Sequence, residues 1–160
     1  MFFRALLAFL VLPAAVGGLI PWLLLPSDSY RTQGTYFGWP VLVLGLSVVL
    51  WCVRDFYRIG KGTLAPWDPP KNLVVVGLYR LTRNPMYIGV LGWVAGLSLI
   101  TGSPLLATYN VLLAVCFHLR IVFYEEPKLA RLFGKEWERY RAHVNRWIPG
   151  RAPWDGTFDT

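Results

Sequence analysis

The chain has 160 residues, the size of one domain; 55% of them are apolar and only 16% are charged. Soluble domains carry about a quarter charged residues, so this composition argues against an ordinary soluble protein and favours lipid surroundings. The net charge of +7 suits the anionic cytoplasmic face of a bilayer as well as nucleic acid, and the apolar content favours the bilayer. We therefore expect one membrane-embedded domain over residues 1–150, with no nucleic-acid partner and no obligate protein partner.

Two apolar segments near the N-terminus predict membrane helices over about residues 5–25 and 37–57. The first carries no charged residue and is about as long as the roughly 20 residues that cross a hydrocarbon core. A signal peptide is the alternative for this segment, but the apolar run is long and Ala14-Ala15-Val16 is a poor cleavage site. Pro13 predicts a kink, which a membrane helix tolerates when its neighbours pack closely.

A basic loop over residues 54–83 separates these helices from a second apolar pair. Residues 84–119 carry no Lys, Arg, Asp or Glu, and Gly102-Ser103-Pro104 divides them with residues typical of a turn. This pattern predicts a helical hairpin with helices over about residues 86–101 and 104–124.

The last part of the chain changes character at Pro127. Apolar residues recur at helical spacing among Lys, Arg and Glu, which predicts an amphipathic helix over about residues 127–145, lying on the membrane surface. Residues 151–160 are expected to be a mobile tail. Because the basic residues concentrate in the 54–83 loop and the C-terminal part, we expect both termini on the cytoplasmic side. The predicted fold is an all-α integral membrane bundle of about four transmembrane helices with a cytoplasmic amphipathic helix.

No motif of a soluble enzyme is present: there is no glycine-rich phosphate loop, no Gly-x-Ser-x-Gly and no cluster typical of a metal site. Cys52 and Cys116 lie in apolar runs and are expected to be small buried side chains rather than a disulfide or metal ligands. Polar residues at two predicted helix ends are the candidates for chemistry. Arg83-Asn84-Pro85 opens the third helix, where free N–H groups favour an anion. Glu125-Glu126 closes the fourth, where negative charge requires a compensating cation.

A ligand that carries both a carboxylate and a cation would match these two helix ends. The structural alternative is that Arg80 and Arg83 are positive-inside anchors and that Glu125-Glu126 caps the following helix. His118 fits a packing residue or interfacial anchor better than a base. Arg120 has three possible roles: an anchor for a substrate anion, a snorkelling side chain and a partner of the acids.

The sequence resembles the isoprenylcysteine carboxyl methyltransferases and the related phospholipid methyltransferases over about residues 60–149. Three pieces carry the resemblance: the Gly-x-Tyr-x-x-x-Arg-(His/Asn)-Pro-x-Tyr-x-Gly pattern from Gly77 to Gly89, the pair Glu125-Glu126, and Phe133-Gly134-x-x-(Tyr/Trp)-x-x-Tyr followed by Arg146-Trp147-Ile148-Pro149.

The resemblance implies a methyltransferase that uses S-adenosylmethionine and a lipophilic, membrane-partitioned substrate. By position, Glu125 matches a cofactor-contacting acid of the family, and Arg120 lies one residue from the family's substrate-anchoring Arg; these two are the candidate catalytic residues, with Arg120 as the candidate substrate anchor. No metal is implied. Together with the residues argued above, the candidate cofactor-binding set is Lys71, Asn72, Leu73, Val74, Tyr79, Arg83, Asn84, Pro85, Met86, Tyr87, Glu125 and Glu126.

Two positions depart from the isoprenylcysteine enzymes. Asn84 stands where they usually have His, which removes a titratable group but keeps a donor and an acceptor. Ile121 occupies the position of their substrate-anchoring Arg, with Arg120 one residue earlier. A carboxylate acceptor is already ionised at neutral pH, whereas an amine requires a base, so the residues favour a carboxylate or thiolate. Phospholipid N-methylation and small-thiol S-methylation remain alternatives, and a non-catalytic membrane scaffold is the alternative of another class.

Overall fold

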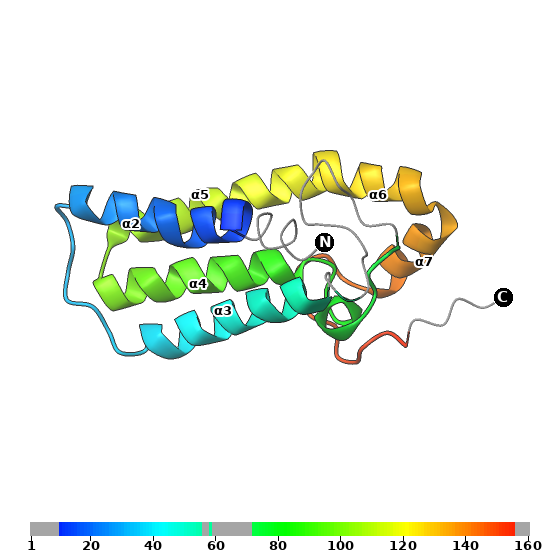
Figure 1. The fold of residues 1–160 in the computed structure, drawn as a ribbon, viewed down its shortest axis with the longest axis horizontal. Coiled ribbons are helices and arrows are strands. Elements are labelled where there is room, and N and C mark those ends of the chain that lie inside the picture. Colours follow the sequence, from blue (N-terminus) through cyan, green and yellow to red (C-terminus); the bar gives the residue numbers. More distant parts are fainter. Residues whose placement is uncertain (1–9, 56–57, 59–71, 156–160) are drawn as a thin grey trace.

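The computed structural model describes residues 10–55, 58 and 72–155. The N-terminal helix and the helices α3, α4 and α5 run side by side along the long axis of the molecule (Figure 1). The N-terminal helix joins three stretches: π-helical η1 (Leu10–Leu19), α2 (Ile20–Leu24) and 3-10 helical η2 (Leu25–Ser27). The elements that follow are α3 (Gly38–Asp55), the 3-10 turn η4 (Gly77–Arg80), α4 (Pro85–Thr101), α5 (Pro104–Arg120), π-helical η5 (Ile121–Glu125), α6 (Glu126–Phe133) and α7 (Lys135–His143).

The predicted helices of the bundle are confirmed within the described residues. The first continues to Ser27, two residues past its predicted end, and Pro13 lies in its π-helical stretch; residues 5–9 lie outside the described part. α3 and α4 match the predicted segments 37–57 and 86–101, except that residues 56–57 are not described. The turn between α4 and α5 uses Gly102 at φ +60°, a conformation that glycine adopts without steric cost.

The predicted helix end at Glu125 is wrong, because one helix runs without interruption from Pro104 to Phe133. Pro127 does not stop it: Pro127 is in the first turn of α6, directly after η5, where the Glu126 N–H donates to the Ile121 carbonyl in the i→i−5 pattern of a π-helix. Proline is tolerated there because the π-helical turn directly before it has already replaced the regular i→i−4 hydrogen-bond pattern. Glu125 and Glu126 therefore lie inside a long helix and do not close one. The argument that negative charge at a helix C-terminus requires a compensating cation does not apply to them.

The predicted amphipathic helix 127–145 is divided at Gly134 into α6 and α7. Gly134 has φ +48°, which an L-residue with a side chain rarely adopts. The predicted mobile tail is also wrong for residues 151–155. Arg80 Nε donates to the Trp154 carbonyl, the Trp154 N–H donates to the Arg80 carbonyl at 3.0 Å, and the Trp154 ring stacks on His143 with centroids 5.5 Å apart.

Glycines allow α3 and α4 to approach closely along their length. A Cβ atom on Gly96 would lie 2.6 Å from Leu42 Cα, and one on Gly45 would lie 2.7 Å from the Gly89 carbonyl oxygen. Helices in membranes pack through such small residues, because lipid provides no hydrophobic force between them. The central cluster of the bundle, formed by Val49, Val90, Val94 and Leu113, lies beside this contact.

Two helical segments are long and apolar enough to cross a membrane: Gly38–Asp55, with 18 residues and mean hydropathy 1.4, and Pro104–Phe133, with 30 residues and mean hydropathy 1.8. Only 11% of the most apolar stretch of the second is buried inside the protein. A core helix of a soluble protein would be mostly buried, so this exposed apolar surface fits contact with lipid. Pro13–Ser27 and Pro85–Thr101 are shorter apolar helices.

Candidate functional site

The candidate site lies at the end of the bundle where α3 ends, α4 begins and the long helix passes from α5 to α6 (Figure 1). The C-terminal segment 144–150 lies against the residues that precede α4. The Arg83 N–H donates to the Asn145 carbonyl at 2.9 Å, and Thr82 and Asn145 form an isolated parallel β-bridge. Two motifs that are far apart in the sequence are therefore neighbours in the fold.

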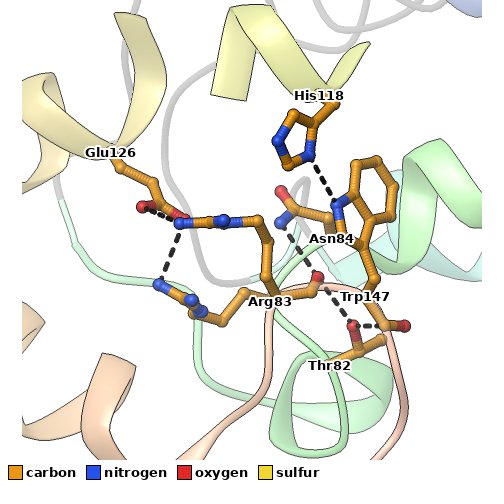
Figure 2. A network of polar contacts seen from close by, with 7 residues as sticks. Thr82, Arg83, Asn84, His118, Glu126 and Trp147 are labelled. Atoms are coloured by element: carbon orange, nitrogen blue, oxygen red, sulfur yellow. Dashed lines mark hydrogen bonds and ion pairs between the residues drawn. The ribbon is translucent and has the colours of Figure 1, made fainter. Parts of the chain in front are cut away.

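Glu126 holds two arginines together at this end (Figure 2). Its carboxylate accepts from Arg146 Nε at 2.7 Å and from Arg146 Nη2 at 2.9 Å, which is the bidentate geometry of an arginine fork. Arg83 Nη1 lies 3.1 Å from the same carboxylate. The side chains of Glu126 and Arg83 are only 15% and 11% exposed, whereas that of Arg146 is 33% exposed.

This geometry fixes the charges of the three groups. Burial by itself raises the pKa of Glu126, but the hydrogen bonds from Arg146 and the charge of Arg83 more than offset it, so the pKa lies below its ordinary value. Burial lowers the pKa of Arg83, against the raising effect of Glu126. Hydrogen bonding to Glu126 raises the pKa of Arg146. The cluster is thus one carboxylate between two cations at neutral pH, with a net positive charge.

Arg83 has one further donor that its neighbours do not use. Its Nε is buried and has no hydrogen-bond partner within the described part of the chain, while its guanidinium carbon lies 5.5 Å from the centroid of the Trp137 ring. Trp137 holds the planar group from one side by a cation–π contact. An arginine held in this way keeps an unused N–H for a further acceptor, such as a ligand carboxylate.

Glu125 belongs to a second cluster, separate from that of Glu126. Tyr87 OH donates to Glu125 Oε1, and Arg120 Nε donates to the same oxygen at 2.8 Å and to Tyr87 OH at 3.2 Å. The Arg120 guanidinium lies 5.7 Å from the centroid of the Tyr124 ring. The Arg120 and Glu125 side chains are 39% and 27% exposed, so this cluster is more open than the first.

The π-helical turn explains how Arg120 meets Glu125. An α-helix brings residues three or four positions apart together on one face, and these two are five apart. The i→i−5 bonds of η5 change the spacing and place the pair on the same side. A π-turn has no simple signature in sequence, so the alternative in which Arg120 pairs with the acids was open but not decided. The structure confirms that contact.

The start of α4 is arranged as expected for an anion site. Asn84 is the capping residue, but its side chain makes no capping bond; instead, its amide donates to the Arg146 carbonyl at 3.1 Å. The N–H groups of the first turn, after Pro85, therefore keep their capacity for a negatively charged group. His118 lies nearby and accepts at Nδ1 from Trp147 Nε1 at 3.2 Å (Figure 2).

The remaining predicted cofactor residues differ in exposure. Val74 and Tyr79 are buried with Cys52 in one cluster, on which Met86 packs, and Tyr140 OH donates to the Tyr79 carbonyl at 2.7 Å. A ligand would reach such residues through their backbone. Asn72 is exposed, Leu73 packs on the cluster around Trp137, Pro85 is buried at the start of α4, and Lys71 lies outside the described residues.

Cys52 and Cys116 are free thiols, the first buried and the second exposed, so the expectation of two buried cysteines holds only for Cys52.

Three residues at this end were not among the predicted site residues. Arg146 is the main partner of Glu126, Trp147 binds His118, and the Thr82 hydroxyl donates to the Arg146 carbonyl at 3.1 Å. Arg146 and Trp147 lie in the motif Arg146-Trp147-Ile148-Pro149, and Thr82 lies at an unspecified position of the Gly77–Gly89 pattern; both carried part of the resemblance but gave these three residues no role.

Comparison with known proteins identifies the family. The family model for phospholipid methyltransferases matches residues 34–136. The chain belongs to this family. The match includes Arg83, Arg120, Glu125 and Glu126, and it ends before Arg146. No solved structure matches the chain at a significant level.

Several curated relatives of this phospholipid methyltransferase family member are methyltransferases by name. Protein-S-isoprenylcysteine O-methyltransferase A of Arabidopsis thaliana is 32% identical over 131 residues, covering 79% of the chain and 65% of the relative. A probable protein-S-isoprenylcysteine O-methyltransferase of Oryza sativa subsp. indica is 32% identical over 83 residues, covering 52% and 44%. Phosphatidylethanolamine N-methyltransferase of Eremothecium gossypii is 27% identical over 124 residues, covering 73% and 14%. The chain thus spans less than two thirds of the length of these relatives.

Proposed function

We propose that the chain is a membrane methyltransferase that takes its methyl group from S-adenosylmethionine and transfers it to a lipophilic acceptor. Family membership and the names of the relatives support transfer of a methyl group. Charged residues from the segment before α4, from the end of α5, and from η5, α6 and the C-terminal segment gather at one end of an apolar bundle, and this observation carries the proposal. The paired charges of the site come from residues between Arg83 and Arg146, and we propose that the domain 1–150 holds them as one unit.

The residues present fit the proposed methyl donor. S-adenosylmethionine carries a carboxylate beside an ammonium and a sulfonium. The unused Arg83 Nε and the uncapped N–H groups of α4 can receive the carboxylate. Glu125, at the more open cluster, is the acid available to a cation. Glu126 lies between two arginines and serves to hold Arg83 in place.

In the membrane arrangement that we propose, the N-terminal helix, α3, α4 and α5 are the four spans. The helix Pro104–Phe133 has 30 residues, about 45 Å, which exceeds a hydrocarbon core of about 30 Å. If the helix enters the bilayer at Pro104, Glu125 and Glu126 lie just beyond the opposite face. The basic residues of the 54–83 loop and the C-terminal part support the proposal that this face, both termini and the site are cytoplasmic.

Catalysis in this site depends on positioning. The bound donor supplies a methyl group that its sulfonium already activates. The arginines and acids would hold the donor at the start of α4, and the apolar helices would admit the acceptor chain and exclude water, which favours in-line attack. Asn84 donates to the Arg146 carbonyl, the Tyr87 hydroxyl donates to Glu125, and the His118 Nδ1 lone pair is engaged by Trp147.

None of those three groups is placed as a base, so an acceptor that is already ionised, such as a carboxylate, is the substrate class that we propose. Arg120, 39% exposed, is the cation available to anchor it. An amine acceptor, as in the name of the Eremothecium relative, would require deprotonation elsewhere. The acceptor chemistry is therefore the part of the proposal that product analysis must decide.

The test is to incubate the purified protein, in lipid nanodiscs, with methyl-labelled S-adenosylmethionine and a panel of prenylated thiols carrying a free carboxylate, aminophospholipids and small thiols. We expect a labelled methyl ester that is released by mild base. A labelled amine or thioether would assign the alternative acceptor. A protein that binds no donor and transfers no label would be a membrane scaffold, and the proposal would be wrong.

A further inference from the structure

Two acids outside the clusters described above are buried, and their surroundings differ. Asp28 and Asp55 are each 8% exposed. Asp28, at the end of the bundle opposite the candidate site, is well provided with donors: the Ser103 hydroxyl, the Tyr30 N–H at 3.0 Å and the Leu105 N–H at 3.3 Å. Asp55 lies at the end of the bundle that holds the site, and its Oδ2 is buried with no hydrogen-bond partner among the residues that the structure describes.

The position of Asp55 makes this carboxylate costly. Asp55 is buried in the final described turn of α3. Burying a carboxylate without a donor or cation costs free energy, and native proteins rarely leave such a group unpaired. No described residue forms an ion pair with it. A buried carboxylate without a partner lowers the stability of the protein. Such a group fits a role in binding, because functional sites often contain residues that lower stability.

The surroundings of Asp55 belong to the proposed donor site. Its Oδ2 lies against Gly77, which has φ +53° and whose missing Cβ leaves space for the carboxylate; the Trp51 indole nitrogen lies at the same place. Gly77 opens η4, which carries Tyr79. One turn before Asp55 on α3, Cys52 packs against Tyr79 and Val74. The carboxylate therefore adjoins the stretch that the family resemblance assigns to the cofactor.

We propose that Asp55 is a binding residue for the methyl donor, and that its carboxylate accepts a hydrogen bond or receives a cationic group from that ligand. The inference rests on the proposed function, because it requires a donor at this end of the bundle. Two parts of S-adenosylmethionine offer the required chemistry: the cationic amino-acid end, with its ammonium and sulfonium, and the adenosine part, with its ribose hydroxyls and adenine amino group. Asp55 thus completes a site in which Arg83 receives the carboxylate and Asp55 a hydrogen-bond donor of the same molecule.

The test compares Asp55→Asn with the matched control Asp28→Asn, an equally buried acid at the opposite end. Affinity for S-adenosylmethionine is measured by calorimetry on the folded protein in nanodiscs, and thermal stability is measured without ligand. We expect Asp55→Asn to bind the donor about 10-fold more weakly, as the loss of a hydrogen bond to a charged group implies. Its stability without ligand should equal or exceed that of the wild type, because an unpaired charge has been removed.

Asp28→Asn should show the reverse pattern, lower stability with donor affinity unchanged. Methylthioadenosine, which keeps the adenosine part but has neither the sulfonium nor the amino-acid part, distinguishes the two parts of the ligand. A 10-fold loss for this probe assigns the contact to the adenosine part, and a loss confined to S-adenosylmethionine assigns it to the cationic amino-acid end. Donor affinity within 2-fold of the wild type, or a stability loss like that of Asp28→Asn with unchanged affinity, would overturn the proposal. If the wild type itself binds no donor, the proposed function fails first.

Discussion

Replacing Glu126 by Gln should destabilise the protein markedly, because it leaves two arginines side by side without their carboxylate. Glu126 makes three charge-assisted contacts at 2.7, 2.9 and 3.1 Å, and it is 15% exposed. Removing one partner of a buried ion pair costs roughly 3–5 kcal/mol. Since Arg146 is 33% exposed, solvent screens part of the interaction, and the lower end, about 3 kcal/mol, is the expected loss.

The assay is thermal unfolding in detergent, followed by tryptophan fluorescence. For a chain of this size, about 3 kcal/mol corresponds to a fall in melting temperature of roughly 6–12 °C. Glu138→Gln, which removes an exposed acid of α7, is the matched control and should change the melting temperature by less than about 2 °C. If Glu126→Gln melts within about 2 °C of the wild type, the cluster does not hold this end of the bundle together.

The same variant gives a pH test with a defined sign. The pKa of Glu126 lies below its ordinary value of 4.5, so its stabilising contribution is complete above pH 4.5 and is lost as the pH falls through the lowered pKa. The difference in melting temperature between the wild type and Glu126→Gln should therefore be constant between about pH 5 and 7 and shrink below pH 4.5. A difference that grows on acidification would contradict this.

Four further predictions concern the site and the topology. Glu125→Gln should stay folded in the membrane and bind S-adenosylmethionine about 10-fold more weakly in calorimetry; unchanged affinity would remove Glu125 from the site. Arg83→Lys should raise the Michaelis constant for the donor more than it lowers turnover, because Lys lacks the planar fork; an activity loss that saturating donor does not reduce would place Arg83 elsewhere. Arg120→Ala should impair anionic acceptors more than neutral ones at nearly unchanged donor affinity, whereas a uniform loss that tracks stability would make it a snorkelling anchor. A cysteine at the exposed Ser29 should react with a membrane-impermeant reagent only from the non-cytoplasmic side, and one at Ala152 only from the cytoplasm, in a background without the native cysteines; labelling of both from one side refutes the topology.

The helices of the bundle could be predicted because their signal is local. α4 is an apolar run bounded by Pro85 and by a turn at Gly102, and both features act within a few residues. The same reasoning failed at Pro127, since a proline ends a helix only where its missing N–H is needed. Directly after η5, whose π-helical turn has already replaced the i→i−4 pattern, it is not.

Several residues of the candidate site could be named from the sequence, but the contacts between them could not. Arg83, Glu125 and Glu126 were singled out because charge at the end of an apolar helix requires a partner. Which acid meets which arginine depends on η5 and on the docking of the C-terminal segment that brings in Arg146. Both are long-range or irregular features without a periodic signal. The contacts of Trp154 with Arg80 and His143 could not be predicted for the same reason, because they join residues that are distant in the sequence.

Photo-crosslinking of the methyl donor to the wild-type protein tests the central claim most directly. The protein in nanodiscs is irradiated with adenosine-labelled S-adenosylmethionine, with and without excess unlabelled donor, and labelled peptides are identified by mass spectrometry. The account predicts competable labelling within residues 72–87 and 120–126, where α4 begins and the long helix carries its acid pair. Competable labelling confined to residues 28–37 and 101–108, at the other end of the bundle, or no competable labelling at all, would contradict it.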